Sequence, residues 1–219
     1  GIALGAMLVT TAANAATIRY RQSGNWTETA PANTGPGWQN ASAVPGINDT
    51  GRLNCGNNTV TVNTTETICK LQIGVDEQGN LEVASGGSLT TDSSGTENGD
   101  LVVGNGNNPV GTGTMLVEAG GIVNVGNILY HGNRANGTSN IFGLVNVSSH
   151  LWTGWKDGIN GEINVNDGGI MNVSGMLGLN WQNNGAIGLL NINDGGRVNL
   201  TQIHASGNSI HGSSLLTIA

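Results

Sequence analysis

The sequence predicts an all-β fold, a right-handed parallel β-helix (a β-solenoid) with an N-terminal cap. A motif of alternating apolar residues recurs about every 27 residues, 37 of the 219 residues are Gly, and only 10% are charged. Typical soluble domains carry about 25% charged residues and about 7% Gly, and helical surfaces need Lys, Glu and Ala. A repeat of this length indicates a solenoid, in which each repeat forms one coil of the chain.

The repeat consists of two alternating apolar runs joined by a corner that contains Gly-Gly. Its clearest copies begin at Gly161 and Gly188, and period-two alternation around such a corner predicts two strands. A third short strand usually follows, so we expect three strands per coil and about five coils within residues 71–219. Further copies begin at Gly79, Gly113, Gly143 and Ser214.

The inward side chains of successive coils should stack, because a single coil cannot bury its own apolar edge. Coils paired in parallel lie about 4.8 Å apart, and we expect Val117, Val147, Val165 and Ile192 to form one file. The copy at Gly143 precedes the next copy by only 18 residues. It therefore predicts a shortened coil, with Leu151-Trp152-Thr153 as its remaining strand.

The N-terminal part of the chain lacks this repeat. Residues 1–15 form a short apolar stretch ending in Ala13-Asn14-Ala15, which is typical of the end of a secretory signal peptide. The alternative is an apolar strand that packs on this subunit or the next. Residues 16–70 contain Trp26 and Trp38, and we expect them to cap the open edge of the first coil, since open β edges invite uncontrolled pairing.

The two cysteines, Cys55 and Cys69, predict a disulfide within the cap, which favours an oxidising compartment. Closing a loop of this length stabilises a protein by about 3 kcal/mol. The alternative is a pair of unbonded, buried thiols, because the spacing is not that of a CxxC redox or zinc motif.

The charge pattern argues against nucleic-acid binding. The net charge is −7, and the seven basic residues are spread along the sequence from Arg19 to Arg197, whereas phosphate binding needs clustered Lys and Arg. Asp167 and Asp194 recur at the same corner of adjacent copies. Asp-Gly favours a tight corner, and the alternative is a Ca²⁺ site built from stacked carboxylates. We favour the corner and expect neither a metal nor a cofactor.

Asparagines recur at outward positions and predict amide ladders along the column, as in cross-β stacks. Asn164 aligns with Asn191, Asn172 aligns with Asn199, and Asn146 should join the column of Asn164. The alternative function of such a surface is to bind sugars. Many asparagines also lie in Asn-x-Ser/Thr glycosylation motifs. These acceptors are Asn25, Asn40, Asn48, Asn57, Asn63, Asn136, Asn146, Asn172 and Asn199.

Trp152, Trp155 and Trp181 lie beside insertions that follow the third strand of a coil. Insertions at one repeated place project on one side of a solenoid, which favours function there. The three rings are candidates for contacting a carbohydrate; the alternative is that they fill space at an irregular coil.

No constellation in the sequence predicts catalysis, and we expect no enzymatic activity. Glycan-cleaving sites need clustered acids, and neither a nucleophile elbow nor a phosphate loop is present. Residues that fall at unrelated positions of the repeat, or lack a matching acid cluster, are His131, His150, His204, His211, Arg134, Lys156 and Arg197.

The chain resembles exported bacterial β-solenoids, in particular autotransporter-passenger-like strand-repeat surface proteins. The resemblance rests on Ser23-Gly24-Asn25-Trp26, on Val44-Pro45-Gly46-Ile47-Asn48-Asp49-Thr50, and on the Gly-x-Leu-x-Val-x-x-Gly-Gly repeats that follow. It covers nearly the whole chain and is specific for architecture alone. It implies a secreted protein, extracellular or attached to the cell surface, with a structural or adhesive role.

From these patterns we expect an extracellular structural or adhesive solenoid, with no membrane span. The repeat stops in mid-pattern at Leu216-Thr217-Ile218-Ala219. Either the chain is a fragment, or this edge pairs end to end with another subunit and builds a surface filament. The alternative function is that of a carbohydrate-binding or polysaccharide-degrading β-helix protein.

Overall fold

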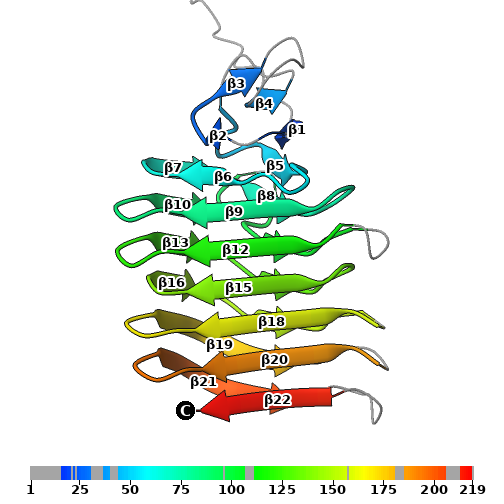
Figure 1. Cartoon of the computed structure of the whole chain (residues 1–219), viewed down its shortest axis with the longest axis vertical. Coiled ribbons are helices and arrows are strands. Elements are labelled where there is room, and N and C mark those ends of the chain that lie inside the picture. Colours follow the sequence, from blue (N-terminus) through cyan, green and yellow to red (C-terminus); the bar gives the residue numbers. More distant parts are fainter. Residues whose placement is uncertain are drawn as a thin grey trace, which may run out of the picture.

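The described part of the chain is all-β in this computed structural model and contains no helix (Figure 1). It comprises residues 16–20, 22, 24–30, 37–39, 44–95, 97–106, 111–156, 158–180, 185–205 and 213–218. The expected signal segment 1–15, Asn40, Trp181 and His211 lie outside these residues. Within them, no helix exists that could cross a membrane.

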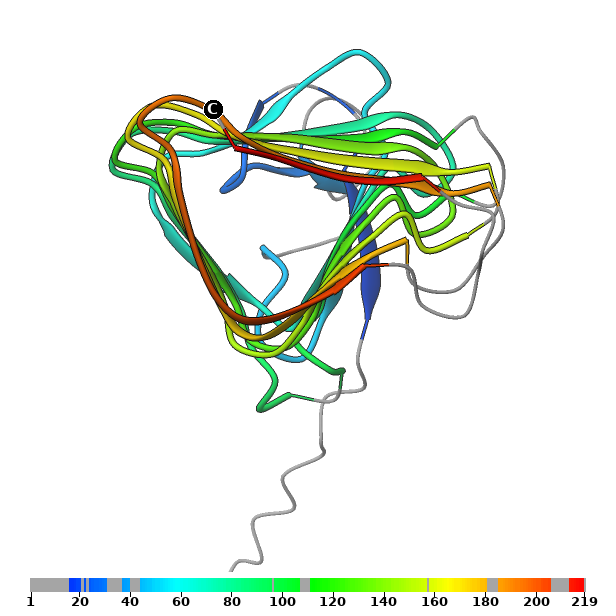
Figure 2. The ribbon, with the colours of Figure 1, turned by 90° about the horizontal axis from the view of Figure 1, so that it is seen from below.

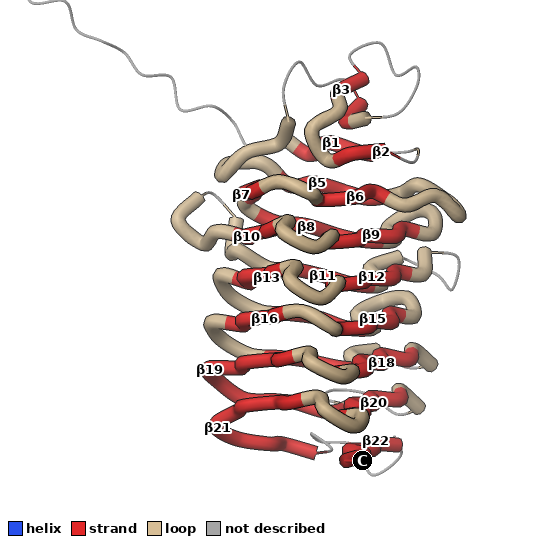
Figure 3. Tube along the Cα trace, turned by 60° about the vertical axis from the view of Figure 1, so that its left-hand side comes forward, coloured by secondary structure: helices blue, strands red, loops and turns tan. Residues whose placement is uncertain are grey.

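The strands lie in stacked coils, and nearly all of them pair in parallel with the coils above and below (Figures 1 and 3). One face is an eight-stranded sheet. Its strands are β2 (Gly24–Asn25), β6 (Val60–Val62), β9 (Gly79–Val83), β12 (Gly113–Val117), β15 (Gly137–Ile141), β18 (Asn160–Val165), β20 (Ile187–Ile192) and β22 (Ser213–Ile218).

A second sheet, of 14 strands, forms the other two sides of the triangular outline in Figure 2. One side comprises β7 (Thr65–Ile68), β10 (Ser88–Thr91), β13 (Ile122–Val125) and β16 (Leu144–Val147). The other comprises β1 (Thr17–Tyr20), β5 (Thr50–Leu53), β8 (Lys70–Ile73), β11 (Leu101–Val103), β14 (Leu129–His131) and β17 (Leu151–Thr153). The long strands β19 (Ile170–Leu179) and β21 (Arg197–Ala205) continue across both sides.

Parallel pairing begins before residue 71, because β5, β6 and β7 already pair in register with β8, β9 and β10. The short strands β3 (Thr29–Ala30) and β4 (Trp38–Gln39) lie at the N-terminal end. Among the strand pairs that the structure describes, β1 and β4 pair in antiparallel orientation and the others pair in parallel. The second sheet is therefore mixed at this end and parallel elsewhere.

The coil that we expected to begin at Gly143 begins at Gly137. Gly113, Gly137 and Gly161 are register partners in adjacent strands of the first sheet. Gly143 lies instead in the corner between β15 and β16, where the chain turns with two residues rather than the four between β12 and β13. The predicted start of this coil and its loss of a strand are therefore wrong, whereas the strand predicted at Leu151-Trp152-Thr153 is confirmed as β17.

The interior files confirm the stacking and correct one of its members. Val117, Ile141, Val165 and Ile192 are successive register partners. Val147 belongs to another file, between Val125 and Val173 on the second sheet. Ser139 occupies the inward position before Ile141, so its polar side chain interrupts the apolar alternation by which the strand would have been recognised.

The amide ladder exists, with Asn146 in a different column from the one predicted. Asn146 Nδ2 donates to Asn124 Oδ1 at 2.9 Å, Asn172 Nδ2 to Asn146 Oδ1 at 2.8 Å, and Asn199 Nδ2 to Asn172 Oδ1 at 2.8 Å. A second ladder runs from Asn191 through Asn164 to Asn140. Each ladder ties neighbouring coils together on the outside, while the apolar files do so inside.

The expected disulfide between Cys55 and Cys69 is wrong, since both thiols are free and buried. Cys55 lies two residues beyond the end of β5, whereas Cys69 directly precedes β8, and these strands pair in parallel. The cysteines therefore lie at opposite ends of a four-residue strand pair. Such a strand spans about 10 Å, and a disulfide requires Cα atoms roughly 4.4–6.8 Å apart. The cysteines give no support for an oxidising compartment.

The corner interpretation of Asp167 and Asp194 fits the backbone. Both side chains are exposed, and each precedes a glycine with positive φ, 74° at Gly168 and 76° at Gly195. A Cβ on Gly195 would overlap Asp167 Oδ1. Within the described residues no three His, Cys, Asp or Glu side chains form a group that could hold a metal.

One histidine is part of the interior. His131 and Ser139 are both fully buried, and a 2.8 Å hydrogen bond joins Ser139 Oγ to His131 Nε2. Burial lowers the pKa of His131 to about 3, because the charged imidazolium would lose its hydration. The ring is therefore neutral in the folded protein at all but strongly acidic pH.

This burial predicts acid sensitivity. Between an unfolded pKa of about 6.5 and the folded value of about 3, only the unfolded state binds the proton, so stability falls as the pH is lowered through this window. The slope should approach ~1.4 kcal/mol per pH unit. Urea unfolding of the native protein and of the double variant His131→Leu/Ser139→Ala between pH 4 and pH 7 measures it. The variant should lose this part of the slope; equal slopes would contradict the assignment.

Candidate functional site

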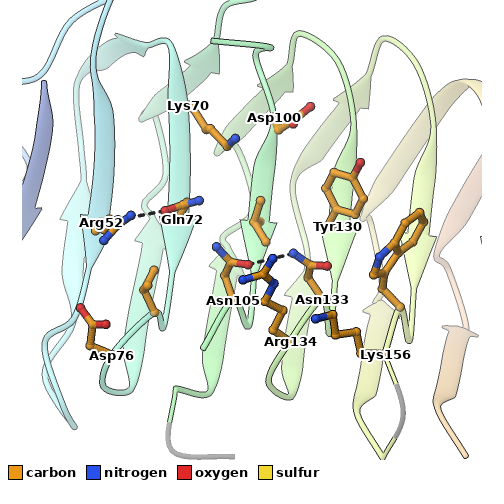
Figure 4. Close-up of a pocket in the computed structure, with 13 residues that line it drawn as sticks. Arg52, Lys70, Gln72, Asp76, Asp100, Asn105, Tyr130, Asn133, Arg134 and Lys156 are labelled. Atoms are coloured by element: carbon orange, nitrogen blue, oxygen red, sulfur yellow. Dashed lines mark hydrogen bonds between the residues drawn. The ribbon is translucent and has the colours of Figure 1, made fainter. Parts of the chain in front are cut away.

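A groove crosses the outer surface of the second sheet, with a volume of about 460 Å³ (Figure 4). It is lined by residues from five adjacent strands, β5, β8, β11, β14 and β17, or from the segments that directly flank them. Neighbouring strands lie about 4.8 Å apart, so the groove runs for about 19 Å along the axis of the solenoid. Its lining residues are Arg52, Lys70, Gln72, Val75, Asp76, Asp100, Val102, Asn105, Tyr130, Asn133, Arg134, Trp155 and Lys156.

The floor of the groove is a row of outward side chains in register. Arg52, Gln72, Val102 and Tyr130 are successive partners on β5, β8, β11 and β14. Their inward neighbours on these strands belong to the core, so the alternation of each strand turns this row outward. Arg52 Nε donates to Gln72 Oε1 at 3.0 Å, which orients both side chains (Figure 4).

One wall is built by the turns at the ends of the strands. After β8, β11, β14 and β17 the chain turns through glycines with φ between 63° and 78°: Gly74, Gly104, Gly132 and Gly154. The next position in this column is Asn180, with φ 58°. A Cβ on Gly104 would overlap the backbone of Ala135 and Asn136 in the next coil. These tight turns present polar side chains to the groove, and Asn133 Nδ2 donates to Asn105 Oδ1 at 2.8 Å.

The opposite wall carries Lys70 and Asp100. Lys70 Nζ lies 3.5 Å from Glu97 Oε2. Asp100 is nearly buried, and its Oδ1 accepts hydrogen bonds from Asn127 Nδ2 at 2.9 Å and from the backbone N–H of Ile128 at 3.3 Å. The carboxylate of Asp100 is thus committed to holding the turn before β14.

Aromatic rings occupy one end of the groove. The rings of Tyr130 and Trp155 meet edge to face, with centroids 5.4 Å apart. The ring centroids of Trp152 and Trp155 are 6.0 Å apart, and Trp152 is only 6% exposed and also packs against His150. Burial and the nearby Asp100 raise the pKa of Tyr130. The phenol stays protonated and can donate a hydrogen bond to a ligand.

The structure therefore separates the three predicted tryptophans. Trp155 lines the groove, Trp152 is buried and packs against Trp155, and Trp181 lies outside the described residues. The sequence analysis missed Tyr130, which is the register partner of Trp152 on the neighbouring strand. The signal that could have found it is the alignment of the third strands of successive coils.

The basic residues that are scattered in the sequence are clustered in space. Four of the seven Lys and Arg residues line the groove, namely Arg52, Lys70, Arg134 and Lys156. Two carboxylates, Asp76 and Asp100, line it as well. Arg197 is exposed at the start of β21, on the side formed by β16 and its neighbours. The spread of the basic residues along the sequence did not indicate this cluster, because only the register of the coils brings the distant positions together.

The histidines remain apart. His131 is in the interior, His150 Nδ1 accepts a hydrogen bond from the backbone N–H of Met176 at 3.0 Å, and His204 pairs with Gly178 on β19. The absence of an enzymatic activity stays a prediction.

The glycosylation motifs differ sharply in accessibility. Asn25, Asn57 and Asn63 are exposed, whereas Asn48 and Asn136 are half-buried. The remaining described acceptors, Asn146, Asn172 and Asn199, use the Nδ2 atom, to which a glycan would be attached, as a ladder donor. A glycan there would break a rung.

A glycosylating secretory host should therefore modify the folded protein selectively. We expect occupancy at Asn25, Asn57 and Asn63 and none at Asn146 or Asn172, because the ladder amides are engaged between coils. Peptide mass spectrometry of the secreted, monodisperse protein gives the occupancy of each site. Substantial occupancy at Asn172 in folded protein would contradict the ladder.

A scan of protein-family models, a search of curated proteins and a search of solved structures return no match to this chain.

Proposed function

We propose that the protein is an exported, extracellular β-solenoid of the autotransporter-passenger-like type, with an adhesive function exerted by binding an extended polysaccharide in the groove. The observation that carries this proposal is the combination of the Tyr130–Trp155 ring pair with a polar floor on adjacent coils. Aromatic rings offer a large apolar surface to the faces of sugars. Amides, guanidinium and ammonium groups offer the hydrogen bonds that hydroxyl groups need.

The shape of the groove favours a polymer over a small molecule. It is an open trough that crosses five strands, and successive strand levels along it are about 4.8 Å apart. This interval is close to the advance of one pyranose unit in an extended chain. A polysaccharide lying along the solenoid axis would thus meet the side chains of one strand level at each successive sugar.

We further propose a right-handed solenoid whose N-terminal end is capped. Parallel strands joined by a crossover in the same sheet are right-handed in about 98% of cases. Tyr20, Trp26 and Trp38 are fully buried near this end, with ring centroids 4.7 to 5.2 Å apart. Trp38 Nε1 donates to Trp26 O at 2.7 Å. These rings would cover the aliphatic files and protect the first coil from uncontrolled association.

The carboxylates of the groove favour binding of a polysaccharide without cleavage of its glycosidic bonds. Cleaving a glycosidic bond requires two carboxyl groups that flank it. Asp76 is engaged with Arg19 at 3.3 Å and accepts from Asn54 Nδ2 at 3.3 Å. Asp100 is held by Asn127 and Ile128. Both carboxylates are committed to neighbouring protein groups, so neither is poised as a general acid or base.

The variants Tyr130→Ala and Trp155→Ala should weaken retention on polysaccharide about tenfold, equivalent to about 1.4 kcal/mol, because each removes a ring face from the groove. Affinity electrophoresis through gels containing a panel of plant, algal and bacterial polysaccharides measures retention. Phe142→Ala is the matched control, since Phe142 is 39% exposed in the corner between β15 and β16, outside the groove.

Retention equal to that of the native protein for both ring variants, or no retention on any polymer, would contradict the proposal. Release of new reducing ends during incubation would contradict binding without cleavage. Circular dichroism of each variant shows whether the β fold is kept.

A further inference from the structure

The groove concentrates positive charge on an otherwise acidic protein. The chain has a net charge of −7, yet four basic and two acidic residues line the groove. Two further residues form ion pairs with the lining: Arg19 pairs with Asp76, and Glu97 pairs with Lys70. They add one positive and one negative charge to the region. The region therefore carries +2, and the remainder of the chain, with two basic and eleven acidic residues, carries −9.

Three of the cations are placed to meet a ligand. Arg52 uses Nε on Gln72, which leaves the other guanidinium N–H groups, and it is in no ion pair with a described residue. Arg134 and Lys156 are exposed on the turn wall. Lys70 contributes less, because its ammonium group is already 3.5 Å from Glu97.

These cations are spaced along the solenoid axis. Arg52 lies on β5, Arg134 follows β14 three strands further, and Lys156 follows β17 one strand beyond that. At about 4.8 Å per strand, Arg52 lies about 14 Å along the axis from Arg134, and Lys156 about 5 Å further. An isolated anion could not contact all of them, whereas a chain with a charge on successive units could.

We propose that the ligand is an acidic polysaccharide that carries a carboxylate on its sugar units, as a uronic acid polymer does. This inference rests on the proposed function and names the chemistry of its ligand. The guanidinium groups of Arg52 and Arg134 match the geometry of a carboxylate, and Lys156 adds a point charge. Tyr130 and Trp155, which lie on the same two strand levels as Arg134 and Lys156, contact the apolar face of a sugar at this end of the groove.

A nucleic acid is the less favoured polyanion. Its affinity comes from neutralising many phosphates, and the groove offers a net charge of +2 inside a surface that is strongly negative elsewhere. That outer charge repels a wide duplex more than a single glycan chain confined to the trough.

Binding of the full chain to polygalacturonate and to its highly methyl-esterified form tests the charge, because the two polymers share one backbone. We expect the acid form to bind at least tenfold more tightly, with affinity falling as salt rises from 50 to 200 mM. The double variant Arg134→Gln/Lys156→Gln should lose at least tenfold on the acid form and remove the preference over the ester. Arg197→Gln, which removes an exposed cation outside the groove, should bind as the native protein does.

The outcomes separate the two proposals. Equal binding of acid and ester forms, weakened in both by Tyr130→Ala, would overturn the acidic ligand and leave polysaccharide binding intact. Binding to dextran sulfate but not to polygalacturonate would overturn the carboxylate. Equal losses in Arg197→Gln and the double variant, or tighter binding of duplex DNA, would overturn the groove as the site of an acidic glycan. Failure of all the polysaccharides to bind would overturn both.

Discussion

In-register parallel pairing between coils is the constraint on which the rest of the molecule depends. No coil closes its own hydrophobic core, so Val117, Ile141 and Val165 become interior residues through the coils above and below them, and Ile192 packs partly buried against this core. The same register places Asn124, Asn146 and Asn172 within hydrogen-bond distance on the outside. It also sets Arg52, Gln72, Val102 and Tyr130 side by side. Core, ladder and groove are three consequences of one alignment.

The sequence was sufficient for the architecture wherever the apolar alternation was intact. Gly161 and Gly188 begin coils as predicted, and the corners at Asp167 and Asp194 form where Gly can adopt a positive φ. The predicted alignment of the repeats failed at the coil that begins at Gly137, where Ser139 occupies an inward position that is apolar in the neighbouring coils. That serine is tolerated because His131 satisfies its hydroxyl. This bond joins the last strand of one coil to the first strand of the next, and no local sequence pattern reveals it. Because the following corner has only two residues, the prediction also assigned Gly143 and Val147 to the wrong column.

The groove could not have been predicted to the same degree. Its residues lie on short third strands such as Leu101–Val103 and Leu129–His131, which carry too few residues for a periodic signal. The loops between these strands and the next coil differ in length, so Arg52, Arg134 and Lys156 have no regular spacing. Only the paired register shows that they share one surface. The disulfide prediction failed for a similar reason. Cys55 and Cys69 are close in sequence, but the register of β5 with β8 places them at opposite ends of this strand pair.

Backbone nuclear Overhauser effects measure the register most directly. The stacked coils predict cross-peaks that link Asn124 to Asn146 and Asn146 to Asn172, and that link Ile141 to Val165. Cross-peaks that instead pair Val165 with Ile170 across the Asp167-Gly168 corner, as in an antiparallel hairpin, would contradict the solenoid and with it the ladder and the groove.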